Sequence, residues 1–578
     1  MNEFSKYADD VLEYDVLVIG SGGAGCEAAI GADESGATVL MIDKGINTRS
    51  GATITAGHTC CAALGPGDTP DLHFEDTLRG GHYMGNQKLV EIYANEAPQR
   101  MIELDKWGTN FDKKNGDFYL IESPGGHSKT RSLHVGFLTG RAIMGAYRKE
   151  LRRRKIDKAE NVLVSSLLTN NGRVVGVTGL NLHNGNFIVC RAKATVLATG
   201  GAGQLYAWTT NPLECTGEGY GLAYEVGAEL VDMEFYQFLF MQVESRIRHM
   251  NCAVGIVHVP RWRKSIRDTG IKLVNALGED FIEKYDAVRG IYTTRDRISI
   301  AVQSEIIAGR GPVYLDLTSV PKEVLDKEFG DTAGTWLPEL EKEGYDLSKE
   351  PIEVAVGAHH FMGGIKINEK AESSVPGLFA AGEVAGGVHG ANRLGGNALS
   401  DIAVFGRIAG INAATYSQST EPLGILEEQV RVEHDRLYKY LNGGAKDGES
   451  SIKLRKRLQR LMLDKVGVIR NGEGLQEAID EIAEIRVKQL PRVVLTNNAK
   501  SYNAELIDAI LLPKMLDLGE MIAKAALLRT ETRGAHYRSD HPATDNKNWI
   551  RNIIIRKVEE EMRLRAESVV ITKVKPEV

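Results

Sequence analysis

Long apolar runs are missing from this sequence, since none reaches the ~18 residues that a membrane-spanning helix needs. The first ten residues, MNEFSKYADD, contain no apolar core of the kind found in a secretory signal. We therefore expect a cytoplasmic protein without direct insertion into a membrane, so that any membrane association goes through a partner subunit. A strong charge of one sign is also missing. With 70 basic and 77 acidic residues the net charge is −7, which gives no reason to expect nucleic-acid binding.

Cysteine is scarce as well. The 578 residues contain six cysteines, and no two of them form a C-x-x-C pair, so the sequence carries no local zinc or iron–sulfur motif. We expect most of these cysteines to be small buried hydrophobic residues. If the protein exchanges electrons with iron–sulfur clusters, another chain must hold those clusters. The chain is too long for one ordinary hydrophobic core, which predicts two to four domains.

Glycine, in contrast, is abundant, and one glycine-rich stretch near the N-terminus organises the chain. The sequence YDVLVIGSGGAGCEAA begins with an apolar run typical of a buried parallel strand. Gly20, Gly22 and Gly25 then form G-x-G-x-x-G at the turn into a helix, whose N-terminus can hold a pyrophosphate. A second apolar run ends at Asp43, about 20 residues on, where an acid holds a ribose hydroxyl. The stretch predicts dinucleotide binding; the alternative is a strand–turn–helix whose glycines serve packing only.

A second glycine turn follows a second buried strand. Residues 162–190 alternate strand and turn signals and lead to the apolar run ATVLAT (194–199), which closes on Gly200. We expect the same sheet to touch the cofactor again at this turn. From Glu234 to about Lys349 charged, helical and irregular segments dominate, which indicates an inserted second domain.

The C-terminal part of the chain is predicted to be helical. Leucines recur on one helix face in residues 454–461, and a longer helix is expected from about Ile510 to Arg529. Three antiparallel helices packed on one another are the natural arrangement. Residues 562–578 are highly charged, and we expect them to be partly loose.

Longer motifs follow one another along most of the chain. They are GSGGAG (20–25), GGHSKTR (125–131), ATGGAG (198–203), LVNALGEDFIEKYD (273–286), TTRD (293–296), HHFMGGI (359–365), GLFAAGEVAGGVHGANRLGGNALSD (377–401) and ALLRTETRGAHYRSDHPATDNKNW (526–549). In this order they resemble the flavoprotein subunits of succinate dehydrogenase and fumarate reductase. That superfamily includes L-aspartate oxidase and the alpha subunit of adenylylsulfate reductase.

The resemblance implies FAD as the cofactor and a fold of class α/β plus α. It consists of a Rossmann-like FAD-binding domain, an inserted α+β capping domain over the flavin and a C-terminal three-helix-bundle domain. We place the first part of the FAD-binding domain at residues 1–233, the capping domain at 234–349 and the second part of the FAD-binding domain at 350–415. The C-terminal helical domain and its tail then take residues 416–578.

The resemblance also implies which residues hold FAD. It matches the glycine turn to the pyrophosphate, Asp43 to the ribose, Glu383 to the ribityl side and the start of the helix after NRLGGN to the flavin pyrimidine. The predicted cofactor residues are Gly20, Gly22, Gly23, Ala24, Gly25, Asp43, Lys44, Ser50, Gly51, Gly126, His127, Ser128, Thr199, Gly200, Glu383, Arg393, Asn397, Ala398 and Leu399. For Glu383 the alternative is a simple cap or turn acid.

One departure from the family bears on how FAD is attached. The membrane-bound members attach FAD covalently through a histidine in an R-S-H-T segment, which here is Arg49-Ser50-Gly51-Ala52. Because Gly51 replaces the histidine, we expect noncovalent FAD. His58, seven positions later, is a candidate for a polar role in the pocket, and a covalent link through it is the alternative.

Three residues match the family's catalytic and substrate-binding positions. Arg295 in TTRD matches the arginine that carries a proton while a hydride passes between FAD and a substrate carbon. A guanidinium normally stays protonated, so this arginine must be buried and crowded next to a carboxylate. His359 and Arg393 match ligands of the substrate carboxylate, which the planar arginine fork can bind bidentately. The alternatives are a domain-interface salt bridge for Arg295 and a packed structural histidine for His359.

Other substrate positions differ from the family. Leu239 stands where the family has a histidine, Arg263 where it has a threonine and Thr269 where it has a glutamate. A pocket that loses polar partners should accept a different substrate, so we do not expect succinate itself. The basic cluster from Arg246 to Arg267 is either a solvated face or subunit interface, or part of a site for a larger or more anionic substrate.

The sequence therefore predicts an FAD-dependent oxidoreductase that acts on the carbon skeleton of a small carboxylate-type substrate. We expect it to be an oligomer or one member of a complex, and the expected partner is an iron–sulfur electron-transfer subunit. Two alternatives stay open. One is amine or sulfur chemistry on the same fold, as in L-aspartate oxidase and adenylylsulfate reductase, and the other is a flavin electron-transfer subunit without its own substrate. Retention of Arg295, His359 and Arg393 argues for carbon–carbon chemistry.

Overall fold

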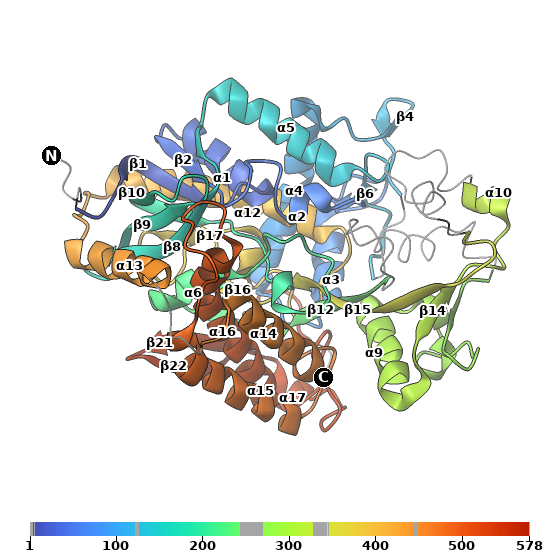
Figure 1. The fold of residues 1–578 in the computed structure, drawn as a ribbon. Coiled ribbons are helices and arrows are strands. Elements are labelled where there is room, and N and C mark those ends of the chain that lie inside the picture. Colours follow the sequence, from blue (N-terminus) through green and yellow to red (C-terminus); the bar gives the residue numbers. More distant parts are fainter. Residues whose placement is uncertain are drawn as a thin grey trace.

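The computed structural model (Figure 1) describes residue 4 and residues 6–121, 126–242, 270–326, 344, 346–442 and 448–576. A seven-stranded sheet forms its central layer. The strands are β1 (Asp10–Ile19), β2 (Val39–Ile42), β7 (Asp157–Ala159), β8 (Val162–Asn170), β9 (Arg173–Asn181), β10 (Phe187–Leu197) and β17 (Leu378–Ala380). The strands β7, β2, β1, β10 and β17 are joined by parallel pairing, and β9 and β8 extend the sheet as an antiparallel pair.

This layer agrees with the sequence prediction. The four apolar residues at the end of β1 are buried, as expected of a central parallel strand. The β8–β9 hairpin turns at Asn171 and Gly172, whose φ values of 51° and 73° suit the right-handed twist of the flanking strands. The helix predicted at residues 139–154 is α5 (Thr139–Arg154).

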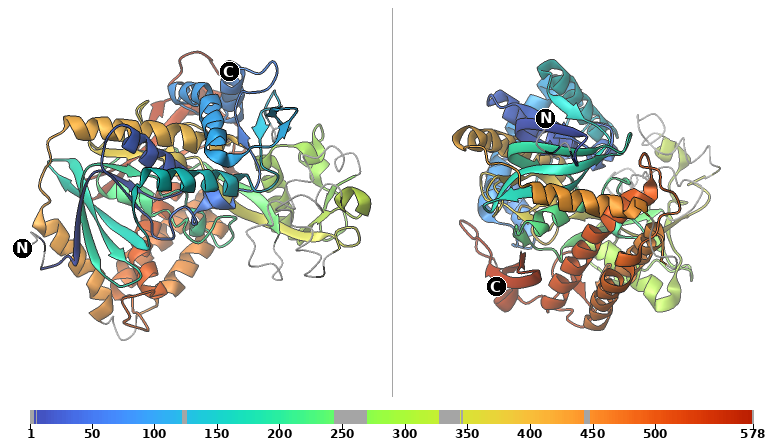
Figure 2. Two further views of the ribbon diagram at one scale, coloured as in Figure 1. Left: turned by 90° about the horizontal axis from the view of Figure 1, so that it is seen from above. Right: turned by 60° about the vertical axis from the view of Figure 1, so that its left-hand side comes forward.

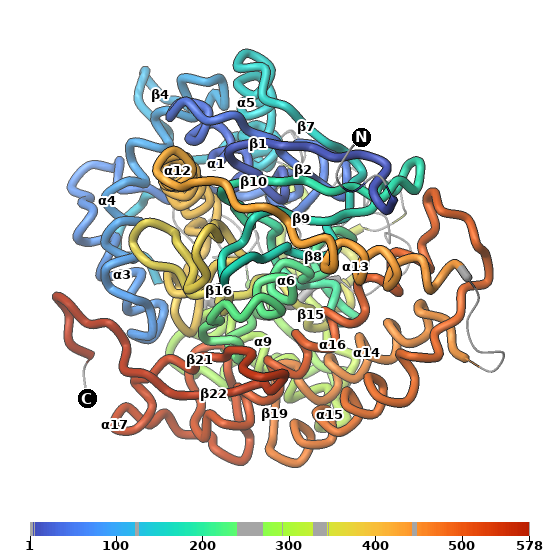
Figure 3. The backbone as a smooth tube through the Cα atoms, turned by 90° about the vertical axis from the view of Figure 1, so that its left-hand side faces the viewer, coloured from blue at the N-terminus to red at the C-terminus, as the bar shows by residue number. Residues whose placement is uncertain are grey.

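Two helices, α1 (Gly23–Glu34) and α12 (Asn397–Ser419), lie side by side next to this sheet (Figure 3). They approach so closely that a Cβ atom at Gly410 would lie 2.0 Å from the carbonyl oxygen of Ala28. Only glycine fits at such a crossing without moving backbone. The contact fixes α12 relative to the glycine turn that starts α1.

A second sheet leads away from the first toward the end of the molecule opposite the N-terminus (Figure 2). Its strands, in the order β12–β15–β14–β13, are β12 (Tyr236–Gln242), β15 (Ile352–Phe361), β14 (Val313–Asp316) and β13 (Lys272–Val274). The helix α9 (Arg295–Glu305) packs on β12 and β15. The return of strand character at residue 352 is confirmed. The predicted domain boundaries remain predictions. The strand β15 lies in the predicted second part of the FAD-binding domain, but it pairs with β12 and β14 rather than with the first sheet.

The C-terminal part contains the predicted group of three helices. They are α14 (Ser451–Lys465), α15 (Gly472–Glu484) and α16 (Ala504–Leu528), and each packs on the other two. The apolar residues Leu454, Leu458 and Leu461 are buried on one face of α14, as their spacing predicts. In the part of the chain that the structure describes, no helix combines the length and the apolarity needed to cross a membrane.

The expectation of helices followed by a loose tail is wrong for the hairpin of β21 (Arg551–Val558) and β22 (Glu561–Ser568). The strand β21 buries three consecutive isoleucines and pairs with β11 (Leu230–Val231), far away in the sequence. Among the described strands, β22 pairs with β21 alone, and it is largely exposed, which explains its charged composition. Beyond the hairpin, backbone N–H groups of residues 572–574 donate to the side-chain oxygen of Gln87, so the chain stays docked at the start of α4 (Gln87–Leu104). Figure 3 shows the end of the chain on the side of the molecule where α3 (Pro70–Gly80) lies.

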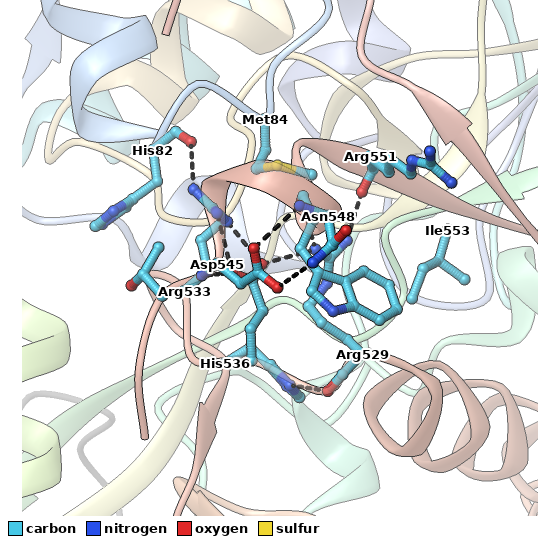
Figure 4. Close-up of polar contacts among 12 residues, drawn as sticks. His82, Met84, Arg529, Arg533, His536, Asp545, Asn548, Arg551 and Ile553 are labelled. Atoms are coloured by element: carbon cyan, nitrogen blue, oxygen red, sulfur yellow. Dashed lines mark hydrogen bonds and ion pairs between the residues drawn. The ribbon is translucent and has the colours of Figure 1, made fainter. Parts of the chain in front are cut away.

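A buried charge network ties this C-terminal part to the rest of the molecule. Figure 4 shows its two arginines, Arg529 and Arg533, with neighbouring residues. Arg529 is fully buried, and its Nε lies 2.6 Å from Oε1 of Glu234, just before β12. Its Nη1 lies 3.0 Å from Oε1 of Glu531, which also binds Arg533 at 2.7 Å. Arg533 in turn donates to the backbone carbonyl of His82. The network therefore joins three segments that are remote in the sequence.

Replacing Glu234 by alanine should destabilise the protein strongly. The change leaves Arg529 buried with fewer carboxylate partners, and breaking a buried ion pair on one side costs about 3–5 kcal/mol. Thermal unfolding of the purified protein measures this loss. Glu428→Ala is the matched control, because Glu428 is 69% exposed and its pair with Arg431 lies at the surface, where such pairs contribute about 1 kcal/mol or less. Equal shifts in Tm for both variants would contradict the assigned role.

Candidate functional site

One continuous cavity runs from the glycine turn after β1 to strands β12 and β15. It contains about 2000 Å³ of empty space, its open mouth included. The predicted site residues that line it are Gly20, Gly22, Gly23, Ala24, Asp43, Lys44, Ser50, Gly51, Thr199, Gly200, Arg295, His359, Glu383, Arg393, Ala398 and Leu399. Residues from motifs that lie far apart in the sequence are thus brought to one place.

The glycine turn at one end of the cavity has the geometry that a phosphate cradle needs. Gly20 has φ +101°, and a Cβ atom on it would lie 2.3 Å from the carbonyl oxygen of Ala198. A Cβ atom on Gly25 would lie 1.9 Å from the carbonyl oxygen of Gly20. The helix α1 starts at Gly23 without a side-chain cap from Gly22. Unsubstituted backbone at a helix N-terminus leaves room and N–H donors for a pyrophosphate.

Asp43 and Lys44 lie where the ribose is expected, at the end of β2, and both already have partners. Oδ2 of Asp43 accepts from N and Oγ of Ser21, each at 2.7 Å, and Oδ1 accepts from N of Gly45 at 2.7 Å. Nζ of Lys44 lies 2.5 Å from Oε1 of Glu218. Each carboxylate oxygen can accept two bonds, so Oδ1 of Asp43 keeps capacity for a ribose hydroxyl.

The other end of the cavity gathers titratable groups in a buried setting. Burial lowers the pKa of Arg393 to about 10 and raises the pKa of Glu383 to about 7. Burial, followed by the positive charges of Arg393 and Arg295, holds the pKa of His359 well below its usual range. The histidine is therefore neutral at pH 7 while Arg393 is charged. This end of the cavity attracts anions.

The side chain of Gln237 on β12 fixes the position of Arg393. Its Oε1 accepts from Nη2 of Arg393 at 3.2 Å, and its Nε2 donates to the backbone carbonyl of Arg393 at 2.9 Å. The same Nε2 donates to Oδ1 of Asn392 at 2.7 Å. A single buried amide thus orients both the guanidinium and the loop that carries it.

Several predicted cofactor residues lie outside the cavity lining, and their assignment stays a prediction. They are Gly25, Gly126, His127, Ser128 and Asn397. N and Oγ of Ser128 donate to Oδ2 of Asp76, and a ring nitrogen of His127 lies 3.0 Å from the carbonyl oxygen of Gly395. Asn397 bonds to side chains of α3. In the structure His127 therefore contacts the glycine loop before α12, whereas Ser128 and Asn397 bond to side chains of α3.

Two departures from the family fall on this cavity. Gly51, with φ +84°, precedes the short helix α2 (Ala52–Thr55) and lines the cavity together with His58. Leu239 on β12 lines the cavity close to the end that holds His359. The other changed positions, Arg263 and Thr269, and the basic cluster around them lie outside the described residues.

The sequence did not single out some residues that line the cavity or act on it. These are Thr53, Thr210, Asn211, Glu218, Gln237, His360 and Asp401. Thr53 accepts a hydrogen bond from N of Gly23 at 3.1 Å. The polar run Thr209-Thr210-Asn211 after the second glycine turn was the one available signal. Gln237 stands two positions before Leu239 in the stretch that was compared with the family, but its role was missed, because its contacts come from a loop about 155 residues later.

The fold and the cavity define a dinucleotide-dependent enzyme, since a G-x-G-x-x-G turn and a cluster of buried cationic and titratable groups share one pocket. A family model described as FAD binding domain matches residues 15–399, and one described as Fumarate reductase flavoprotein C-term matches residues 455–578. The chain therefore belongs to the fumarate reductase and succinate dehydrogenase flavoprotein family. It is an FAD-dependent oxidoreductase.

Individual relatives agree with this family. A fumarate reductase (CoM/CoB) subunit of Methanothermobacter marburgensis is 37% identical, over 95% of this chain and 98% of its own. L-aspartate oxidase of Streptomyces coelicolor is 32% identical, over 94% of this chain and 91% of its own. The solved structure of FrdA of Escherichia coli quinol fumarate reductase has a TM-score of 0.88 at 29% identity, and covers 98% of this chain and 99% of its own.

Replacing Gly25 by alanine should remove bound FAD. The new Cβ would overlap the backbone oxygen of Gly20 at 1.9 Å, so the turn that holds the pyrophosphate must open. The ratio of flavin absorbance to protein in the purified variant measures the loss, and far-UV circular dichroism reports whether the fold survives. Full FAD content in Gly25→Ala would contradict the assignment.

Gly145→Ala is the matched control for this change. Gly145 lies inside α5, and a Cβ atom on it has no atom within 4 Å among the described residues. The control should keep its FAD, and alanine in a helix interior should raise the stability by about 0.5–1 kcal/mol.

Proposed function

We propose that this protein transfers a hydride between FAD and a carbon of a small carboxylate-bearing substrate, with Arg295 as the proton carrier. The observation that supports the proposal is the burial of Arg393 in the cavity without an ion-pair partner among the described residues. This guanidinium is 6% exposed, lines the cavity and has, among the described residues, no carboxylate within ion-pair distance. A buried cation without a counterion is costly, so the carboxylate of a substrate is its natural partner.

The roles of the remaining residues follow from their chemistry. Arg393 and His359 bind the substrate carboxylate, the first through its planar fork and the second through a ring nitrogen. Arg295 lies in the first turn of α9, next to Asp296 in the sequence. In the proposed reaction its guanidinium donates a proton to the substrate or takes one from it. Bound FAD supplies the hydride acceptor or donor. Glu383, whose pKa is raised to about 7 by burial, lies on the cofactor side of the pocket.

Arg295→Ala should keep FAD and lose turnover. Removing a group that transfers a proton in the transition state costs about 10²–10⁴-fold in rate. Turnover is measured with reduced enzyme and an unsaturated acid, and the FAD content is measured in parallel. Arg297→Ala is the matched control, because Arg297 is exposed on the same helical turn. A variant of Arg295 with normal turnover would remove this residue from the mechanism.

The attachment of FAD is proposed to be noncovalent, because Gly51 occupies the position of the family's ligating histidine. Acid precipitation of the holoenzyme should leave all of its flavin in the supernatant, as shown by absorbance. A precipitate that keeps flavin, with fluorescence on the protein band of a denaturing gel, would contradict the proposal. His58→Ala then tests whether that histidine forms the link.

The identity of the substrate is tested by anaerobic reoxidation of the reduced flavin with unsaturated mono-, di- and tricarboxylates. Leu239 replaces a polar family residue in the cavity, and losing a hydrogen-bond partner changes which substrates a site accepts. We therefore expect an acid other than fumarate to react fastest. Rapid reoxidation by fumarate would mean that Leu239 is tolerated in a fumarate site.

A second candidate is amine oxidation. It is supported by the 32% identity to L-aspartate oxidase and by the altered substrate end of the cavity. Oxygen-dependent release of peroxide with L-aspartate, in the absence of any reaction with unsaturated acids, would favour it.

The proposed partner is a protein with iron–sulfur clusters. This proposal is supported by the methanogen relative, which is named as one subunit of a fumarate reductase and therefore works within a complex. Copurification from the native organism and metal analysis of the complex test this partner.

A further inference from the structure

The ring of His359 is hydrogen-bonded to a threonine that has no role in the proposed mechanism. Nδ1 of His359 lies 2.8 Å from Oγ1 of Thr210. Thr210 belongs to the loop after the second glycine turn and lines the same cavity as His359. Since Nδ1 is turned toward the threonine, the nitrogen available to a ligand in the cavity is Nε2. The proton on the threonine hydroxyl therefore decides what Nε2 can do.

The surroundings of Thr210 fix the direction of that hydroxyl proton. Its only other close acceptor among the described residues is the carbonyl oxygen of Ala358, at a long 3.4 Å. That carbonyl already accepts from Oγ1 of Thr209 at 2.9 Å and from N of Thr210 at 3.0 Å. Two short bonds use both lone pairs of a carbonyl oxygen. The Thr210 hydroxyl therefore donates to Nδ1 of His359.

Asn211 completes the arrangement. Its Nδ2 donates to the backbone carbonyl of His359 at 2.8 Å and approaches Oγ1 of Thr210 at 3.4 Å. The amide thus offers a donor to the threonine oxygen, which leaves the hydroxyl hydrogen for the imidazole. The two contacts of Asn211 hold Thr210 and His359 in fixed positions relative to each other.

Because His359 is uncharged, its hydrogen bond with Thr210 determines whether Nε2 donates or accepts. The charged groups around the ring are Arg295 at the start of α9 and Arg393 on the loop before α12, with Glu383 and the neutral His360 beyond them. Because of its burial and these arginines, His359 is neutral near pH 7. A neutral imidazole is a donor at one nitrogen and an acceptor at the other. With Nε2 unprotonated, the ring would repel a carboxylate.

We propose that Thr210 is a positioning residue that holds His359 in the tautomer with its proton on Nε2, so that an uncharged histidine donates a hydrogen bond to the substrate carboxylate. This inference rests on the proposed function for the identity of the ligand. Thr210 does not touch the reacting atoms in this scheme. It determines which ring nitrogen of His359 carries the proton, and therefore whether Nε2 of His359 donates or accepts a hydrogen bond.

The first arm of the test measures the tautomer without any ligand. Holoenzyme with ¹⁵N-labelled histidine is studied by NMR, and the ring signals of His359 are assigned by their loss in His359→Gln. We expect a protonated Nε2 and an unprotonated Nδ1 in the wild type and in Thr210→Ser. In Thr210→Val the signals should move toward a mixture of both tautomers. A protonated Nδ1 in the wild type would overturn the proposal.

The second arm measures binding of oxalate, followed by its perturbation of the flavin absorbance. Thr210→Val should weaken oxalate binding about 10- to 100-fold, the range expected for a lost charge-assisted hydrogen bond, and Thr210→Ser should restore it. Once the pH is low enough to protonate the buried imidazole, which is well below the usual range for histidine, the valine variant should regain affinity, because a protonated imidazole donates from both nitrogens. A loss that is independent of pH, or no loss at all, would contradict the assigned role.

The two arms separate this inference from the proposed function. If the wild-type holoenzyme binds no carboxylate at any pH, the proposed function fails while the NMR experiment still decides the tautomer. Equal FAD content and equal Tm in Thr210→Val and Thr210→Ser show that both variants fold. If the valine variant does not fold, the serine variant and the wild-type NMR signals still decide the question.

Discussion

The positive charge of Arg393, which is buried and has no carboxylate within ion-pair distance among the described residues, is the constraint on which the rest of the site depends. Two other buried arginines have carboxylates beside them, since Arg529 has Glu234 at 2.6 Å and Arg131 has Asp68 at 3.0 Å. The fully buried Arg470 donates to backbone carbonyls outside the cavity. Arg393 instead has a neutral amide, Gln237, as its direct side-chain partner. Keeping an arginine charged without a counterion in a buried place is unfavourable. The fold tolerates this cost in the cavity where the proposed function places the carboxylate of a substrate.

The surrounding structure holds the loop of Arg393 from several sides. N of Ala391 donates to the carbonyl oxygen of Gly81 at 2.9 Å, and N of Ala535 donates to the carbonyl oxygen of Ala391 at 2.9 Å. A Cβ atom on Gly534 would lie 2.5 Å from that same carbonyl oxygen. The C-terminal turn at Gly534 and Ala535 therefore contacts the loop of Arg393 directly, and the buried charge network around Arg529 holds this turn in place. Through these contacts the C-terminal segment supports the loop of Arg393, the proposed substrate-binding residue, which lies more than a hundred residues away in the sequence.

The sequence predicted those parts of the fold and the site that depend on local pattern. The glycine turn, the strands around it and α5 could be predicted, because strand and helix periodicity and a motif with a known backbone geometry are local signals. The β21–β22 hairpin could not, since β22 is mostly exposed and its charged residues are typical of a loose tail. Gln237 and Thr210 were missed for a related reason. The polar run around Thr210 was the one local signal, and the importance of both residues comes from Arg393 and His359, which reach them only through the tertiary structure.

Under the proposed function, two positions of strand β12 have different roles, one in binding the carboxylate and the other in the choice of substrate. Gln237 and Leu239 lie two residues apart on this strand, and each pairs with β15, the strand that carries His359. Gln237 is committed to Arg393 through both of its polar atoms, so a change there disturbs the anion site itself. Leu239 lines the cavity with an apolar side chain and holds no other group in place through hydrogen bonds. Position 239 can therefore vary with the substrate while the arginine, its amide partner and the histidine on β15 stay in place.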